Sequence, residues 1–249
     1  MMGHRTTFWT TTLLLAAGPA LAAAAEMRFT GSARTDAGDL IYLEQHQVNG
    51  SCQEGVFRPQ SHRIGYVKPE SEAEFATKDL TYQDSVIRPA VDFRQPDFGE
   101  TLRITYPSVS NLTIDWRTPE GRERSFDVAF GQDLVVDAGF DNFVRRHWDS
   151  VLAGEAVPFR FLGPTRGEHY GFVLEPADSS RITAEQVLQI RPTGMVLRFL
   201  VDPIVLGYDG NGALTDYYGL TNIRKDEDTN HTAHIRYSVE IWPDCELTP

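Results

Sequence analysis

The sequence predicts a mainly β protein: an antiparallel β-barrel or half-barrel of roughly ten to twelve strands with one amphipathic α-helix. Three observations carry this prediction. Apolar and polar residues alternate along many short runs, turn-forming residues separate these runs, and one segment has its apolar residues at helical spacing. A sheet of this many strands needs full or partial closure to protect its edges.

The strand prediction depends on period-two alternation, because successive side chains of a strand point to opposite faces. In the C-terminal run, Ile235, Tyr237, Val239 and Ile241 alternate with polar residues. The same alternation occurs at 102–106, 112–116, 159–161, 170–174 and 197–201. Turn signals lie at 36–38, 119–121, 192–194 and 209–212. Each run is therefore expected to have one packed face and one wetter face.

The helix prediction covers residues 140–152. The apolar positions of this segment are Phe140, Phe143, Val144, Trp148, Val151 and Leu152. They form one stripe at a period of about 3.6 residues. Asp137 or Asp141 is expected to cap the start of the helix and Gly154 to end it. An isolated helix with this stripe must pack on apolar surface, so we expect it at the mouth or the open side of the sheet.

The N-terminus predicts a signal peptide over residues 1–25, followed by a single β-rich domain over 26–249. His4 and Arg5 precede an apolar run at 13–21, and small residues offer cleavage sites near Ala22–Ala25. The apolar run is shorter than the ~20 residues that span a bilayer, so no transmembrane segment is predicted. The expected location is periplasmic or secreted.

The charge balance bears on partners. The chain carries 23 basic and 35 acidic residues, a formal net charge of −12. Loss of Arg5 with the signal peptide would take the mature form to −13. Such a protein repels phosphate backbones, so a nucleic-acid partner is not expected. The sequence does not determine the oligomeric state.

Two cysteines, Cys52 and Cys245, lie in the predicted mature chain. An even cysteine count in an exported protein favours a disulfide between them, and two separate buried thiols are the alternative.

No motif predicts a catalytic residue, a cofactor or a metal ion. His231 and His234 are three residues apart, so on one strand they would face opposite sides and could share a metal only in a turn. The segment Asp209-Gly210-Asn211-Gly212 resembles the start of a calcium loop, but the spacing then fails, and a hairpin turn is the better interpretation.

Arginines within strands are the most suggestive polar pattern. Arg160, Arg198 and Arg236 each lie between apolar neighbours that point the other way. On a concave inner face they would form a basic cluster suited to a carboxylate or phosphate group. The favoured alternative is a solvated outer face on which they pair with glutamates.

Two stretches resemble a group of exported bacterial β-proteins of unknown function. They are the run Val135–Phe143 and the run from Asp202 through Ile223. That group is similar to periplasmic lipid carriers and lipocalin-like barrels. The resemblance implies a barrel or half-barrel with a helix against its opening, and it implies no catalytic residues.

The resulting hypothesis is an exported binding protein for a lipid or another apolar or amphiphilic small molecule. The candidate ligand-binding residues are Arg160, Arg198, Arg236, Trp148 and Phe143. The alternatives are a structural envelope protein with a filled barrel and a hydrolase with a site at the strand ends. A hollow interior lined by aromatic residues would favour binding, and a filled interior would favour the structural role.

Overall fold

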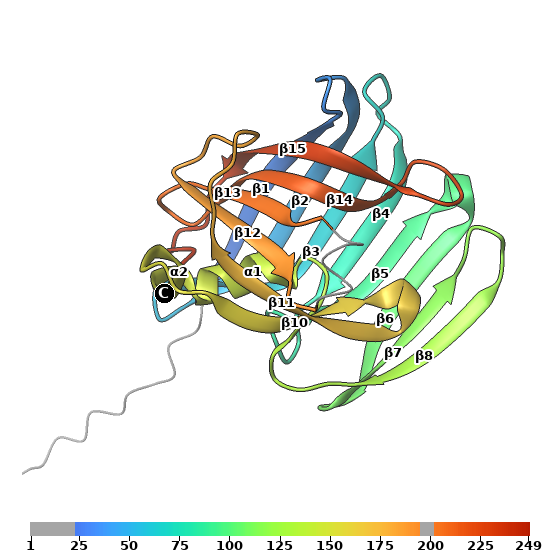
Figure 1. The fold of residues 1–249 in the computed structure, drawn as a ribbon, viewed down its shortest axis with the longest axis horizontal. Helices are drawn as coiled ribbons and strands as arrows, with labels where there is room; N and C mark the ends of the chain where they lie inside the picture. The colour runs from blue at the N-terminus through green and yellow to red at the C-terminus, as the bar shows by residue number, and fades with distance from the viewer. Residues whose placement is uncertain (1–22, 195–201) are drawn as a thin grey trace, which may run out of the picture.

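A computed structural model describes residues 23–194 and 202–249. They form one curved sheet of fifteen strands together with a few short helices (Figure 1). The first eight strands are β1 (Ala24–Arg34), β2 (Leu40–Gln53), β3 (Val56–Val67), β4 (Glu74–Thr81), β5 (Ala90–Gln95), β6 (Glu100–Ser108), β7 (Asn111–Arg117) and β8 (Glu123–Ala129). The others are β9 (Leu134–Val135), β10 (Val157–Gly163), β11 (Glu168–Pro176), β12 (Gln186–Pro192), β13 (Ile204–Tyr208), β14 (Leu214–Arg224) and β15 (Asn230–Ile241). The run predicted at 197–201 lies outside the described residues.

The sheet is open, with the order β8-β7-β6-β5-β4-β3-β2-β1-β15-β14-β13-β12-β11-β10-β9. The chain steps outward from β1 to the edge strand β8, then starts again at the opposite edge with β9 and returns to β15 beside β1. All pairs are antiparallel except β9 with β10, which is parallel. The predicted mainly β class is confirmed. Closure into a barrel is wrong, and the predicted strand number is too low.

The sheet rolls around α1, with β10–β13 facing β1–β4 across it (Figure 1). The β10–β11 hairpin comes close to β8 without pairing with it. A Cβ on Gly167 would lie 2.4 Å from the ring of Phe126, and the His169 ring contacts the Ala129 carbonyl at 3.2 Å. The two ends of the sheet thus meet through these contacts, and no strand ladder joins them in the described part of the chain.

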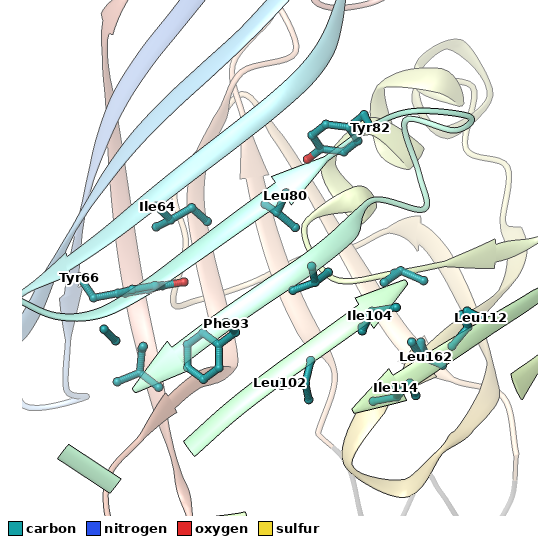
Figure 2. Packing of buried hydrophobic residues seen from close by; sticks show 14 of the residues in the cluster. Ile64, Tyr66, Leu80, Tyr82, Phe93, Leu102, Ile104, Leu112, Ile114 and Leu162 are labelled. Atoms are coloured by element: carbon teal, nitrogen blue, oxygen red, sulfur yellow. The ribbon is translucent and has the colours of Figure 1, made fainter. Parts of the chain in front are cut away.

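Buried apolar residues of neighbouring strands cover the inner face of the roll. Figure 2 shows Ile64 of β3, Leu80 of β4 and Ile104 of β6 in this layer. Leu162 of β10 belongs to the same buried cluster as Ile114 of β7. This cluster therefore joins residues of β7 and β10, which lie near opposite ends of the sheet. This packing helps to keep the sheet curved, because strand pairing does not join its two ends.

The predicted helix is two helices, α1 (Gly139–Arg146) and α2 (Trp148–Leu152). They meet at His147, whose φ of −106° and ψ of 22° depart from helical geometry. Neither Asp137 nor Asp141 makes a side-chain cap at the start of α1, and Ala138 is its N-cap. Gly154, at φ +87°, follows the last helical turn, as expected for a glycine that ends a helix.

The C-terminal segment is held to the β2–β3 hairpin by the predicted disulfide. Cys52 and Cys245 are bonded, with their Cα atoms 5.9 Å apart. The Phe57 amide donates to the Glu246 carbonyl at 2.7 Å, and Leu247 is buried beside Phe57. The turn at 209–212 is also confirmed, with Gly212 at φ +78° between β13 and β14.

No helix in the described part of the chain is long and apolar enough to cross a membrane.

Candidate functional site

The rolled sheet encloses a cavity of about 880 Å³. Its wall comes from the inner faces of β1–β4, from β10–β15 and from α1, and eleven of the described phenylalanine and tyrosine residues line it. Cavities that hold small molecules in proteins commonly measure about 300–1,000 Å³ and are mostly apolar. The interior is therefore hollow rather than filled by side chains, and its size suits a small organic ligand.

Strand β2 gives the cavity an acidic and a basic side chain among apolar ones. Tyr42, Glu44, His46 and Val48 are all buried and all line the cavity, while the residues between them are exposed or partly buried. This is ordinary strand alternation, so the fold places Glu44 and His46 inside as firmly as it places Tyr42.

A β-bulge in β3 directs His62 into the same cavity. Gly50 of β2 pairs with Pro59 and Asn49 pairs with Ser61, so Gln60 is an extra residue in β3. The extra residue shifts the alternation by one position, and His62 is buried opposite Val48. Without it, His62 would point outward, because one residue of shift reverses every side chain of a strand.

Four side chains then form one hydrogen-bonded chain in the wall. The Tyr237 hydroxyl donates to Glu44 Oε2 at 3.1 Å, and His46 Nε2 lies 2.9 Å from the same oxygen. His46 Nδ1 lies 2.9 Å from His62 Nε2. Phe29 stacks on the His46 ring at 4.1 Å and 14°, which fixes the ring plane. Burial lowers the pKa of His62 well below its ordinary value, so that ring is neutral.

A buried ion pair lies beside the start of α1. Lys78 Nζ contacts both carboxylate oxygens of Asp137, at 2.9 and 3.0 Å, and the Asn222 amide donates to the same carboxylate at 3.1 Å. Asp137 has a φ of +48°, a left-handed conformation that aspartate tolerates better than most residues. One carboxylate thereby connects β4, β14 and the start of α1.

A second ion pair fixes α1 itself. Arg145 contacts Asp141 at 2.9 Å, one helical turn away, and its Nε donates to the Gly212 carbonyl at 2.8 Å. The Tyr208 hydroxyl donates to Asp141 at 3.1 Å. Burial raises the pKa of Asp141 despite the neighbouring Arg145. These contacts hold the cavity-facing side of α1 against the β13–β14 turn.

Two of the predicted ligand-binding residues lie in the packing behind the cavity wall. Phe143 packs on Phe159, with ring centroids 4.7 Å apart, and Trp148 meets Tyr208 edge-on at 5.6 Å. Both are buried in the contact between the helices and β10–β13, and neither lines the cavity. Their predicted ligand contact stays a prediction.

Two of the three predicted arginines, Arg160 and Arg236, do not line the cavity. Arg160 Nη2 donates to the His169 carbonyl at 2.6 Å, and Arg236, 70% exposed, lies 3.9 Å from Asp216. Arg198 lies outside the described residues. Binding of a ligand by these residues stays a prediction.

Sequence reasoning missed Glu44, His46, His62 and Lys78. A signal was present, because Glu44 and His46 occupy the same period-two register as Tyr42 and Val48. The position of His62 depends on the bulge, which no local pattern predicts. The histidines at 231 and 234 do face different surroundings, with His231 near Tyr42 and His234 bonded to Asp216 at 2.7 Å.

Comparisons with known proteins give structural similarity only. No family model and no curated protein matches the sequence. A β-barrel-like protein of the domain of unknown function DUF1849 from Brucella abortus is similar at 11% identity and a TM-score of 0.39, over 90% of this chain and 98% of that chain. A putative outer membrane lipoprotein-sorting protein domain from Vibrio parahaemolyticus is similar at 10% identity and a TM-score of 0.27, over 88% of this chain and 83% of that chain. The predicted resemblance to exported barrel-like proteins is thus confirmed, at a level that carries no argument about function.

Proposed function

We propose that this protein is an exported binding protein that holds an apolar or amphiphilic small molecule in the cavity of its rolled sheet. The observation that carries the proposal is the 880 Å³ cavity with its aromatic wall. A structural protein with a filled interior has no use for such a space. Apolar surface left open to water is costly, and a ligand that covers it gains about 25 cal/mol per Å².

The polar groups of the wall support an amphiphile over a purely apolar molecule. Glu44, His46, His62, Lys78 and Asp137 all line the cavity, and they face apolar surface within the same enclosure. Ligand sites commonly combine a mainly apolar wall with a few fixed polar groups that orient the ligand. An apolar body with one polar group would match this wall.

Two features support export. The N-terminal 25 residues have the order of a signal peptide, and a disulfide joins the two cysteines of the chain. Disulfides persist in oxidising compartments outside the cytoplasm.

Titration with a fluorescent alkyl probe tests the binding. Leu214 lines the cavity and is partly buried, so Leu214→Trp should fill space that the ligand needs and weaken probe binding at least tenfold, ~1.4 kcal/mol. Leu152→Trp is the matched control, because Leu152 is 46% exposed on α2 and does not line the cavity. Absence of saturable binding to the unmodified protein, or equal weakening by both variants, would contradict the proposal.

A further inference from the structure

When both imidazoles are neutral, the donor and the acceptor of each hydrogen bond in this chain of side chains are fixed. The Glu44 carboxylate accepts from the Tyr237 hydroxyl and from the Nε2–H of His46. A neutral His46 then has only a lone pair on Nδ1, so His62 must donate its Nε2–H across the 2.9 Å contact. Nδ1 of His62 is left with a lone pair at the end of the chain.

That lone pair has no partner within the described part of the protein. The hydrogen bond of His62 uses Nε2, and the fully buried polar side-chain atoms without a partner are the hydroxyls of Tyr42 and Thr215. His62 lines the cavity and is 8% exposed, so its free nitrogen is reached from the cavity. The bulge at Gln60, which turns His62 inward, gives the wall this acceptor. Bulges often re-aim a side chain at a functional site.

The charges of the interior wall do not favour an anionic group at this position. Among the described residues of the wall, Lys78 is held by Asp137 and Arg145 by Asp141, so these two interior cations are paired. The other cationic lining residue, Arg166, is exposed to solvent. A carboxylate brought to His62 would lose its hydration and meet the Glu44 carboxylate with no unpaired interior cation among the described lining residues, whereas a hydroxyl would gain an acceptor.

We propose that the cavity selects a neutral amphiphile whose head group carries a hydroxyl, and that this hydroxyl donates to Nδ1 of His62. The proposal rests on the proposed function, since it names the chemical class of the ligand that the cavity would hold. Glu44 and His46 are positioning residues, because they fix the tautomer of His62 without touching the ligand. Tyr237 and Phe29 hold them in place.

Three ligands of equal chain length separate the contributions of a hydroxyl, an ether oxygen and a carboxylate to the affinity. Dodecanol, dodecyl methyl ether and dodecanoate are compared at about pH 8, where imidazole is neutral and the carboxylate is charged. Competition against a fluorescent alkyl probe gives the three affinities. The ether keeps the oxygen and lacks the donor, so the ratio of alcohol to ether isolates the hydroxyl. We expect the unmodified protein to bind the alcohol about fivefold or more tightly than either other ligand.

Two histidine variants test whether the preference for the alcohol depends on His62. His62→Phe keeps a ring and removes the acceptor, so it should lower alcohol affinity to that of the ether and leave ether affinity unchanged. His231→Phe is the matched control, because His231 is a partly buried histidine that does not line the cavity, and it should keep the preference.

Equal binding of alcohol and ether by the unmodified protein would overturn the inference without any variant, even if His62→Phe failed to fold. Tighter binding of dodecanoate, or a preference that survives in His62→Phe, would overturn it as well. If none of the three ligands displaced the probe because no probe bound, the proposed function itself would fail.

Discussion

Four ionisable side chains, Glu44, His46, His62 and Lys78, occupy inward positions of β2, β3 and β4, where a sheet usually packs apolar groups. Each is buried, and each has a polar partner at hydrogen-bond distance. Burial of such groups without partners would cost several kcal/mol, so the partners are part of the fold. They also leave the cavity with fixed polar positions on an apolar wall.

Stability should depend on pH through His62. Burial, and to a smaller extent the positive charges of Lys78 and Arg145, lower its pKa well below the ordinary 6.5. The unfolded chain binds a proton as the pH falls through about 6.5, and the folded chain does not until the pH is lower. The free energy of unfolding should therefore fall between about pH 7.5 and about pH 5.5.

Urea unfolding at the two pH values measures this difference, and His62→Phe should reduce it. His231 also has a pKa lowered by burial, but it is only partly buried, so His231→Phe should reduce the difference less. An identical difference in the unmodified protein and in His62→Phe would show that the ring is not buried neutral.

Lys78→Met should lower the free energy of unfolding by about 3–5 kcal/mol, because the largely buried Asp137 carboxylate loses its cation. Adding Asp137→Asn removes the uncompensated charge and should restore most of the loss. Asparagine suits this position, since it tolerates the left-handed backbone found there. Urea unfolding of the two variants gives the values, and an equal loss in both would mean that the ion pair is not what is being disrupted.

At the scale of elements, alternation predicts strands where the inner face is apolar. The runs at 102–106, 112–116, 159–161, 170–174 and 235–241 lie in β6, β7, β10, β11 and β15. Strands β2 to β4 were harder to predict, because Glu44, His46 and Lys78 make their inner faces look polar. The bulge at Gln60 then interrupts the period within β3. Alternation therefore predicts fewer strands than the sheet contains.

The helical stripe predicted the packing of the helices but not the break between them. His147 ends α1, and α2 begins with Trp148, whose ring meets Tyr208 of β13. The stripe residues Phe143, Val144, Trp148 and Val151 are buried, as a helix on a sheet requires. The departure from helical geometry at one residue leaves no periodicity signal.

Trp148→Ala should lower the free energy of unfolding by about 3–5 kcal/mol, because it removes a large buried side chain from the contact between α2 and the sheet. Leu152→Ala, in the same helix at an exposed position, should change it by less than ~1 kcal/mol. Chemical denaturation of both variants tests the assignment. A loss below ~1 kcal/mol for Trp148→Ala would indicate a helix that moves away from the sheet easily.

At the scale of the whole molecule, closure depends on contacts far apart in the sequence. The ends of the sheet meet through Phe126, Gly167 and His169 rather than through a strand ladder. Alternation within single strands carries no information about such contacts. Partial closure follows from the need to protect edges, whereas the open order and the cavity depend on side chains from both ends of the chain.

The disulfide should contribute strongly to stability, because Cys52 and Cys245 are separated by 193 positions. The chain-entropy estimate for such a loop is about 5 kcal/mol. Replacing both cysteines by serine should lower the melting temperature and leave the β-rich circular dichroism unchanged. Thiol labelling of the denatured, unreduced protein should find no free thiol, and two labelled thiols per chain would contradict the bond.

Native mass spectrometry of the protein purified from the cells that make it tests the central claim most directly. The hollow interior predicts a small amphiphile bound at one molecule per chain, and Leu214→Trp should carry less of it than Leu152→Trp. A protein that is recovered without any bound small molecule and that binds none of the alkyl ligands would contradict the claim. The structural role would then be the better account of this fold.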